Sequence, residues 1–343
     1  MDTRCYRLQH GGEVHTLVWA LSCSEKSTPW TLSPVSERNS ENRYKKNEPN
    51  NSNLSRGIHV RPDPLRILST IFPILLMLLL PSDPSGATHL KIISFNAGTG
   101  KNPVPNLDHV IEAIQATGVP ADVLLAQEIP WSVKHDDLAR KLGFKHFVSG
   151  LILNPRCTRA IFSRTKLIDP FVIETERSPQ KRIFTSAPGA LCATTVIRET
   201  HVLLCSVHLE TMRNEMSADE SIDDTGVIFR YVQHELFNQN IRSRSVGTII
   251  EKMSEIAINR VIIAGDFNTF PFSKAIRKMG SVYNDAFSFS TAFFKGSYID
   301  SPFCIKPRLD HIFHSPNMSA RKSTVHDITS GDHVPISTII RID

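Results

Sequence analysis

From residue 88 onward, short apolar runs alternate with amphipathic stretches, and most of the apolar runs end at a polar residue. Each run has the length and the aliphatic or β-branched composition that is typical of a strand. We expect strands at 89–96, 123–126, 160–163, 190–197, 202–208, 261–268, 309–313 and 334–342. The fourth and fifth of these runs flank Glu199-Thr200 and together predict a hairpin.

Two stretches place apolar residues at the spacing of an amphipathic helix. The first begins at Leu107, after the N-cap candidate Asn106, and stops at Gly118. The second is expected to be one long helix over about 229–256. Because no repeat and no Pro/Gly-rich linker interrupts 88–343, we expect these elements to form one domain.

The first 87 residues differ in composition from the rest. Residues 1–64 are rich in Ser, Asn and charged residues without an apolar period, so we expect a disordered tract or an over-extended reading of the gene. Residues 65–87 combine Arg66, an apolar core at 67–80 and small residues up to Ala87, the pattern of a secretory signal peptide. The core spans 14 positions, fewer than the roughly 18–20 of a membrane span. This favours export, secreted or periplasmic, over the alternative of a membrane anchor that keeps the segment in contact with lipid.

Composition narrows the classes of function. The 343 residues are 41% hydrophobic, which is enough for a sizeable core. The net charge of +5 falls to +3 without residues 1–87, since 29 basic and 26 acidic residues remain, and this excludes a broad polyanion-binding surface. The six cysteines include no CxxC pair, so we do not expect a structural zinc site. Cys157, Cys192, Cys205 and Cys304 could form one or two disulfides, and their pairing is open.

The run Val261–Asn268 breaks at Gly265 and delivers Asp266 and Asn268 two residues apart. At the period of a strand, these two side chains leave the backbone in the same direction. An acid that takes a proton from water, beside an amide that holds a phosphate oxygen, is what phosphoester hydrolysis requires. The alternative is an ordinary Asp/Asn turn, so the other polar strand ends decide between the two interpretations.

Polar residues also end or interrupt the other apolar runs. The full set is Asn96, Glu128, His208, Asp266, Asn268, Asp310, Asp332 and His333. Each of them alone has an ordinary explanation as a cap, a turn or a surface acid, but side chains at parallel strand ends would gather on one rim. Such a rim holds carboxylates, imidazoles and amides without a thiolate, which favours Mg²⁺ or Mn²⁺ as the bound ion.

Six segments, in this order, resemble the magnesium-dependent endonuclease/exonuclease/phosphatase superfamily, which includes deoxyribonucleases, abasic-site endonucleases, neutral sphingomyelinases and inositol polyphosphate phosphatases. They are 93–96 (ISFN), 121–128 (ADVLLAQE), 206–209 (SVHL), 265–268 (GDFN), 308–313 (RLDHIF) and 331–335 (GDHVP). The resemblance implies a catalytic domain over 88–343 with an α+β fold, a four-layer sandwich of two packed mixed β-sheets flanked by helices.

The resemblance also implies a role for each residue at the rim. Glu128 would bind the cation, with Asp332 and Asn96 completing its shell. Asp266 would orient and deprotonate the attacking water, and Asn268 would hold the water and the phosphate in line. The expected reaction is therefore direct hydrolysis, without a covalent enzyme intermediate.

Two histidines complete the implied machinery. His333, paired with Asp310, and His208 would donate hydrogen bonds to the transition state. The chain departs from the family pattern near both of them. Gly331 stands between a serine and the Asp-His pair, so we expect a more mobile loop there. The segment 157–159 (Cys-Thr-Arg) replaces a usual Gly-Asn, which leaves the support of His208 open and offers its arginine as a phosphate contact.

The substrate class is open, and three sets of residues bear on it. The favoured class is a nuclease or another phosphodiesterase, which would bind its substrate with a basic stretch. The ordinary explanation of such a stretch is a solvated face. Its residues are Arg156, Arg159, Arg164, Lys166, Arg177, Lys181 and Arg182. An acidic loop would repel a long nucleic acid: Glu210, Glu215, Asp219, Glu220, Asp223 and Asp224. The alternative is a phospholipid or inositol phosphate phosphoesterase at a membrane, which would contact the membrane with exposed aromatic side chains. We expect these aromatic residues to pack in the core instead. They are Phe287, Phe289, Phe293, Phe294, Tyr298 and Phe303. A catalytically inactive binding module is the alternative of another class, and we expect a monomer.

Overall fold

The computed structural model describes residues 5–10, 13–18, 88–98, 107–129, 133–179, 186–215, 225–300, 306–328 and 331–342. The chain separates into two compact units, Met1–Asp83 and Pro84–Asp343. In the first unit, β1 (Cys5–His10) and β2 (Glu13–Val18) form an antiparallel hairpin that the sequence pattern did not predict. The apolar run at 67–80 lies outside the described residues, so the disorder and signal-peptide interpretations stay predictions.

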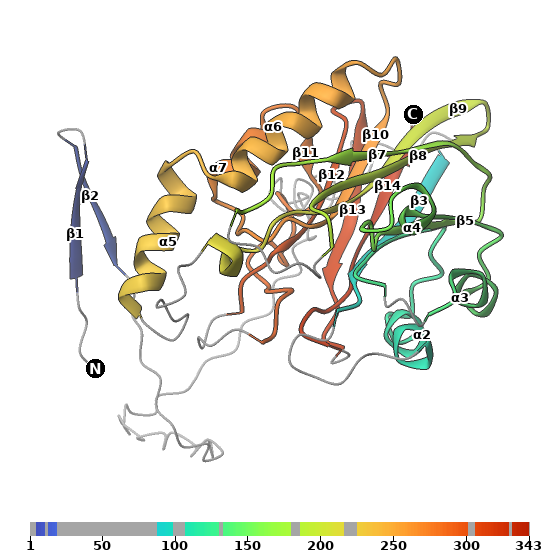
Figure 1. Ribbon diagram of the computed structural model, residues 1–343, viewed down its shortest axis with the longest axis horizontal. Helices are drawn as coiled ribbons and strands as arrows, with labels where there is room; N and C mark the ends of the chain where they lie inside the picture. The colour runs from blue at the N-terminus through green and yellow to red at the C-terminus, as the bar shows by residue number, and fades with distance from the viewer. Residues whose placement is uncertain are drawn as a thin grey trace, which may run out of the picture. The chain divides into compact units, whose positions relative to one another are not determined.

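The second unit contains two six-stranded mixed sheets (Figure 1). The sheet that we call the β10 sheet has the order β11-β12-β10-β9-β8-β7. Its strands are β7 (Leu167–Glu174), β8 (Gly189–Ile197), β9 (Thr200–His208), β10 (Val261–Asp266), β11 (Asn284–Asp285) and β12 (Asp310–His314). The β3 sheet has the order β13-β14-β3-β4-β6-β5. Its strands are β3 (Thr88–Asn96), β4 (Val123–Gln127), β5 (His146–Ser149), β6 (Ala160–Ser163), β13 (Met318–Val325) and β14 (Ile336–Ile342).

The two sheets pack face to face, and helices cover their outer faces (Figure 1). Aliphatic side chains of both sheets, such as Leu125 and Ile262, form the core between them. Helices α6 and α7 pack on the β10 sheet, and α2 and α3 pack on the β3 sheet. The helices are α2 (Leu107–Ala116), α3 (His135–Leu142), α4 (Gly150–Leu153), α5 (Thr225–Phe237), α6 (Ile241–Ser254), α7 (Lys274–Gly280) and a 3₁₀ turn η1 (Met212–Glu215). The expected four-layer α+β sandwich is therefore confirmed.

Each sheet brings the ends of two parallel strands to one edge. In the β10 sheet, β9 and β10 are parallel, with His208 opposite Asp266, and the antiparallel β12 begins with Asp310 opposite Asp266. In the β3 sheet, β3 and β4 are parallel, with Asn96 opposite Gln127. Polar residues at adjacent strand ends therefore become neighbours, as the sequence pattern indicated.

Gly265 allows β10 to lie close to β9 one residue before the strand ends. Its φ is 151°, and a Cβ at this position would lie only 1.9 Å from the carbonyl oxygen of Val207. Only glycine combines this backbone conformation with such a close approach. The glycine of the GDFN segment thus fixes the place at which Asp266 leaves the sheet.

The expected long helix over 229–256 is wrong, because two helices occupy this stretch. Helix α5 ends at Phe237, and α6 begins after Asn240. The side chain of Asn240 accepts a hydrogen bond from the backbone N–H of Ser243, and the Ser243 hydroxyl accepts one from the N–H of Asn240. This reciprocal capping box satisfies the free N–H groups of a new helix start and ends the continuous apolar stripe.

One disulfide joins the hairpin strands. Cys192 of β8 and Cys205 of β9 are directly opposite in register and are bonded, with their Cα atoms 4.2 Å apart. Cys157 is a buried free thiol, and Cys304 lies outside the described residues. Among the helices that the structure describes, none has the length and hydropathy of a membrane span.

Candidate active site

The predicted site residues meet at one edge of the sandwich and come from both sheets. The β3 sheet contributes Asn96 and Glu128; the β10 sheet contributes His208, Asp266, Asn268 and Asp310; the loop before β14 contributes Asp332 and His333. Glu128 and Asn268 each follow a strand and have φ values of 51° and 50°. This left-handed conformation ends the strand pairing and turns both side chains out of the ladder.

Asp266 is the centre of the hydrogen bonds at this edge, and its side chain is 2% exposed. Its Oδ1 accepts the backbone N–H of Asn268 at 2.7 Å, and its Oδ2 accepts the side-chain amides of Asn96 at 3.0 Å and Asn268 at 3.2 Å. The bond from Asn96 crosses from one sheet to the other. Burial raises the pKa of Asp266 to about 6, although the positive charge of His333 lowers it. The carboxylate is therefore a base with a pKa close to neutral pH.

His333 and Asp310 form a buried pair. Nδ1 of His333 lies 2.7 Å from Oδ2 of Asp310, and its Nε2 lies 3.5 Å from Oδ2 of Asp266. Burial alone would lower the pKa of His333, but the carboxylates of Asp310 and Asp266 raise it to about 10. At neutral pH His333 is thus an imidazolium with N–H donors on both ring nitrogens.

His208 has the opposite charge state. Its Nε2 lies 3.2 Å from Oε1 of Glu128 and 3.9 Å from Oδ2 of Asp266. Burial lowers the pKa of His208 to about 4, so its ring is neutral at neutral pH. Its Nδ1 is buried and has no hydrogen-bond partner. The two histidines therefore place one charged and one neutral donor on either side of Asp266.

Three oxygen-bearing residues suit a hard divalent cation. A Cβ on Gly98 would lie 2.3 Å from Oε2 of Glu128 and 3.1 Å from Oδ1 of Asn96, so these two oxygens line one small space. Oδ1 of Asp332 is buried without a partner, and burial together with the Glu128 carboxylate raises the pKa of Asp332. Asn96 Oδ1 also accepts the backbone N–H of Gly98 at 2.9 Å, and carboxylate and amide oxygens are the ligands that Mg²⁺ prefers. The donor set Asn96, Glu128 and Asp332 therefore fits the expected ion.

A second group could also hold an ion. Within the described ranges, Asp266, Asp310 and His333 each offer one ligand atom, and these atoms lie within 4.8 Å of one another. His333 and Asp310 already bond to each other in this group, and Asp266 accepts two amides. The group is therefore better suited to proton and hydrogen-bond chemistry than to binding a cation.

Two supporting residues had no signal in the sequence. The hydroxyl oxygen of Ser297 accepts the backbone N–H of Asp310 at 3.0 Å, and its carbonyl accepts the N–H of Val334 at 2.9 Å. The ring of Tyr298 lies 5.1 Å from that of His333 at 62°, and the two residues form a β-bridge. The loop that carries His333 is thus tied to 297–298 on both sides. A lone serine before a tyrosine in a loop carries no pattern that could predict this.

Arg159 does not lie on a solvated face, as the basic stretch suggested. It is completely buried and donates from Nη1 to the carbonyl of Ala187 at 2.6 Å. Burial is the largest cause that lowers the pKa of His208. The positive charge of Arg159 lowers this pKa further, whereas the negative charge of Asp266 raises it. Of the same stretch, Arg156, Arg164 and Lys166 are exposed, while Lys181 and Arg182 lie outside the described residues.

The acidic loop and the aromatic cluster also differ from their expected surroundings. Glu210 is buried and Glu215 pairs with Arg242, so neither presents a free charge to a polyanion, and the other four acids lie outside the described residues. Core packing holds for Phe287, which is fully buried, but Phe294 is 79% exposed. The remaining aromatics divide as follows: Phe289 is exposed, Phe293 and Tyr298 are half-buried, and Phe303 lies outside the described residues.

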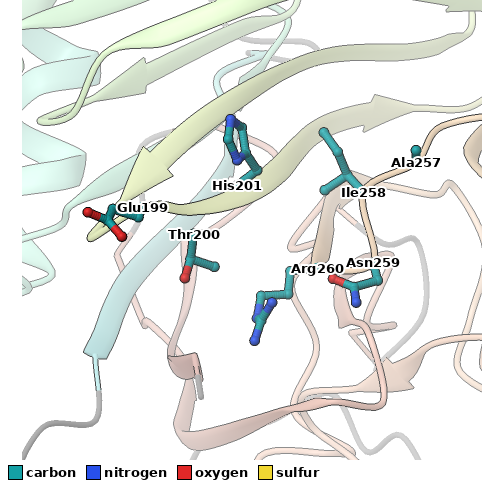
Figure 2. Close-up of a pocket in the computed structure, with 7 residues that line it drawn as sticks. All are labelled: Glu199, Thr200, His201, Ala257, Ile258, Asn259 and Arg260. Carbon is teal, nitrogen blue, oxygen red and sulfur yellow. The ribbon is translucent and has the colours of Figure 1, made fainter.

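The pocket in Figure 2 lies away from this chemistry. Its lining includes Glu199, Thr200 and His201 at the start of β9 and Asn259 and Arg260 before β10. The catalytic candidates lie at the other ends of the same two strands. The pocket of Figure 2 therefore contains none of the site residues.

Comparison with known proteins shows what this chain is similar to. A family model described as "Endonuclease/Exonuclease/phosphatase family" matches residues 93–333. None of the curated proteins compared with the chain matches it.

Three solved structures illustrate the likeness of fold. TDP2 from D. rerio, complexed with a single-strand DNA product, has 17% identity and a TM-score of 0.53, covering 74% of this chain and 99% of that chain. Sphingomyelinase C from Streptomyces griseocarneus has 16% identity and a TM-score of 0.51, covering 75% and 100%. The human Nocturnin catalytic domain with bound sulfate has 16% identity and a TM-score of 0.50, covering 76% and 98%. At these identities the likeness shows the fold alone.

Proposed function

This chain belongs to the endonuclease/exonuclease/phosphatase family. From this premise, we propose that it hydrolyses phosphodiester bonds with Mg²⁺ or Mn²⁺ as cofactor. Membership makes the chain a hydrolase of the phosphoesterase and nuclease class. The ion, the residue that activates water and the substrate are our proposal. Its main support is Asp266, a buried carboxylate held by two amides and placed between a neutral and a charged histidine.

In this proposal, Asp266 accepts a proton from the water whose oxygen attacks phosphorus. Asn96 and Asn268 hold the carboxylate still, so little reorganisation accompanies the proton transfer. His333 donates from Nε2 to the charge that develops on the phosphoryl group, while Asp310 holds its ring and keeps it protonated. His208 offers a neutral donor beside Glu128.

The cofactor would be held by Asn96, Glu128 and Asp332. When bound there, Mg²⁺ or Mn²⁺ supplies positive charge that stabilises a phosphoryl oxygen and the leaving group.

The test is turnover by the full chain with and without chelator. The substrates are bis(p-nitrophenyl) phosphate, duplex DNA, single-stranded DNA, RNA, sphingomyelin vesicles and inositol phosphates. We expect hydrolysis of at least one phosphodiester, complete inhibition by EDTA, and recovery with excess Mg²⁺ or Mn²⁺. Absence of turnover on every substrate, with a folded protein, contradicts the proposal and leaves the inactive binding module. Turnover that EDTA does not affect contradicts the metal assignment alone.

An exposed aromatic patch favours a second candidate, hydrolysis of a phospholipid at a membrane surface. The patch consists of Phe272, Phe293 and Phe294, whose rings contact one another with centroids 4.9–6.1 Å apart. Phe272 is 52% and Phe294 79% exposed. Contiguous exposed apolar side chains of this kind mark surfaces that bind a partner or a lipid.

The aromatic patch is connected to the catalytic strands. Phe272 follows Asn268 by four residues, and the buried Arg308 donates to the carbonyl of Phe293 at 3.2 Å from a position two residues before Asp310. The Arg308 guanidinium also lies 5.2 Å from the centroid of the Phe293 ring. The aromatic patch is therefore linked, through Arg308 and the segment after β10, to the strands that carry the site.

Two exposed lysines accompany the aromatic patch. Lys295 follows Phe294 directly, and a Cβ on Gly296 would lie 2.0 Å from the carbonyl of Lys306, so the two lysine segments are in contact. The Lys295 ammonium group is bonded to Asp327 at 2.7 Å. Apolar rings beside lysines fit an anionic lipid interface, where the rings enter the acyl boundary and the ammonium groups stay at the headgroups.

Phe272→Ser combined with Phe294→Ser tests this candidate. We expect the ratio of vesicle-borne to soluble-reporter turnover to fall about tenfold, because full burial of a Phe side chain contributes about 1.5–3 kcal/mol and only part is inserted. Val196→Ser is the matched control, since Val196 is 38% exposed and lies at the far end of β8. An unchanged ratio in the double variant contradicts the lipid candidate. A selective loss of turnover on single-stranded DNA would instead assign the patch to base stacking.

We also propose that the protein is exported. The apolar segment at 67–80 is the sequence support, and the disulfide between Cys192 and Cys205 is a bond that persists in oxidising compartments. We propose in addition that it acts as a monomer, since every residue of the proposed site comes from one chain.

A further inference from the structure

A buried carboxylate lies behind the site and takes no part in the chemistry described above. Glu235 is carried by α5 and is 1% exposed. Its Oε1 accepts the amide of Asn240 at 2.6 Å and Nε of Arg242 at 2.9 Å, and its Oε2 accepts the hydroxyl of Thr269 at 2.6 Å. Arg242 is itself fully buried and forms a second contact with Glu235 from Nη2. One carboxylate thus joins α5, the start of α6 and the segment after β10.

Both arms of this network reach the residues that hold Asp266. Thr269 directly follows Asn268, so the bond from Thr269 to Glu235 anchors the backbone on which Asn268 sits. On the other side, Nη1 of Arg242 donates to the carbonyl of Glu210 at 3.0 Å. Glu210 follows Leu209, whose carbonyl accepts the side-chain amide of Asn268 at 3.0 Å.

Asn268 is thus fixed from two directions, through its backbone and through its amide. Its left-handed φ of 50° is a conformation that the surrounding structure must maintain. The same network accounts for the break between α5 and α6, because Asn240 both caps α6 and donates to Glu235. Burial of the Arg242 guanidinium disfavours its charged form. The carboxylates of Glu235 and Glu215 offset this effect, because they raise the pKa of Arg242 and keep it charged.

We propose that Glu235 and Arg242 are positioning residues that set the orientation of Asn268 and, through it, of the Asp266 carboxylate. The inference rests on the proposed function, since it assigns these residues to the same hydrolytic site. Neither residue touches the substrate in this account; each acts through the two segments that it holds.

Thr269→Val is the sharpest test, because it removes one hydroxyl donor and leaves the Glu235–Arg242 pair in place. We expect kcat on bis(p-nitrophenyl) phosphate to fall about tenfold, since small displacements of a catalytic group cost about ten- to a hundredfold in rate. KM and the Mg²⁺ concentration for half-maximal activity should change less than about twofold, because neither substrate binding nor the cation ligands are altered. Thr269→Ser, which restores the donor, should recover the wild-type kcat.

The double variant Thr269→Val with Glu235→Gln measures the coupling of the two residues. If they act through one bond, the double variant should have no lower kcat than the poorer single variant. Thr248→Val is the matched control, since the Thr248 hydroxyl donates to the carbonyl of Arg244 in its own helix. A wild-type kcat for Thr269→Val, or additive effects in the double variant, overturns the inference.

Hydrogen exchange separates failure of the inference from failure of the function. Amide exchange at 209–211 and 267–269 should accelerate in Thr269→Val and remain unchanged in Thr248→Val. If the wild-type chain proves inactive, the proposed function fails, and unchanged exchange at these segments would independently overturn the positioning role. If the wild type is active and Thr269→Val is equally active, the function stands and the inference is wrong.

Discussion

Replacing Asp266 by asparagine should lower kcat on a phosphodiester by at least about 100-fold, the lower range for loss of one positioned base. The variant keeps the volume of the side chain but has only one acceptor oxygen. Asp266 accepts three hydrogen bonds, from the backbone of Asn268 and from the amides of Asn268 and Asn96. An amide at 266 can neither take the proton from water nor accept all of these donors. Steady-state kinetics at saturating Mg²⁺ measures the loss.

The fold should survive this change. Removal of a buried charge relieves the desolvation that raises the pKa of Asp266, so the melting temperature should stay close to the wild-type value. Asp327→Asn is the control for a change of charge alone, since the Asp327 side chain is 82% exposed and pairs with Lys295. Turnover by Asp266→Asn within tenfold of wild type would remove Asp266 from the role of base.

His333→Ala should reduce kcat by about 100- to 1,000-fold, the range found for loss of one donor to a transition-state oxyanion. The imidazolium is the charged donor of the site, and no other cation among the described residues lies against Asp266 in its place. The substitution also leaves Asp310, which is 1% exposed, without its partner. Breaking a buried pair in this way costs about 3–5 kcal/mol of folding stability.

A double variant separates the two effects of this substitution. His333→Ala with Asp310→Asn removes the uncompensated charge, so the free energy of unfolding should recover by a large part of the loss. The rate should not recover, because the donor is still absent. His201→Ala, at the opposite end of β9 from His208, is the control for loss of an imidazole. Recovery of kcat in the double variant would show that His333 acts on stability and not on the transition state.

The central strands were predictable because they are buried on both faces, and their sequences are therefore continuous apolar runs. The predicted runs at 160–163 and 190–197 match β6 and β8 to within a residue, and the hairpin of β8 and β9 forms as expected. Their side chains pack between sheets or under helices, so the residues are continuously apolar.

Within the second unit, the described strands that the sequence did not predict are the four edges of the two sheets, β5, β7, β11 and β13. An edge strand has one unpaired side and is protected by short length, charges or bulges. β11 has two residues, β13 carries Arg321 and Lys322 beside a shift in register, and β7 contains Pro170 beside another. These features prevent edge-to-edge association, and they also remove the alternation by which a strand is recognised.

The candidate site residues also divide into those that the sequence pattern indicated and those that it did not. Asp266, His208 and Asn96 could be found because each ends a strong apolar run, where a polar residue stands out. Ser297 and Glu235 could not, because one lies in a loop and the other within an amphipathic helix, where polar residues are ordinary. Their contacts join segments that are distant in sequence, and only the folded arrangement reveals them.

The pairing of β3 with β14 has a consequence for whatever is attached to this domain. Thr88 and Ile342 are direct partners in this antiparallel pair, so the domain's first and last strand residues are neighbours. Thr88 begins the nine-residue strand that Asn96 ends, about 26 Å away at 3.3 Å per residue. A tag or a surface linker added after Ile342 would therefore start at the end of β3 opposite Asn96, whose amide bonds to Asp266. Immobilisation through that end should leave the catalytic edge open to a bulky substrate such as a duplex or a lipid surface.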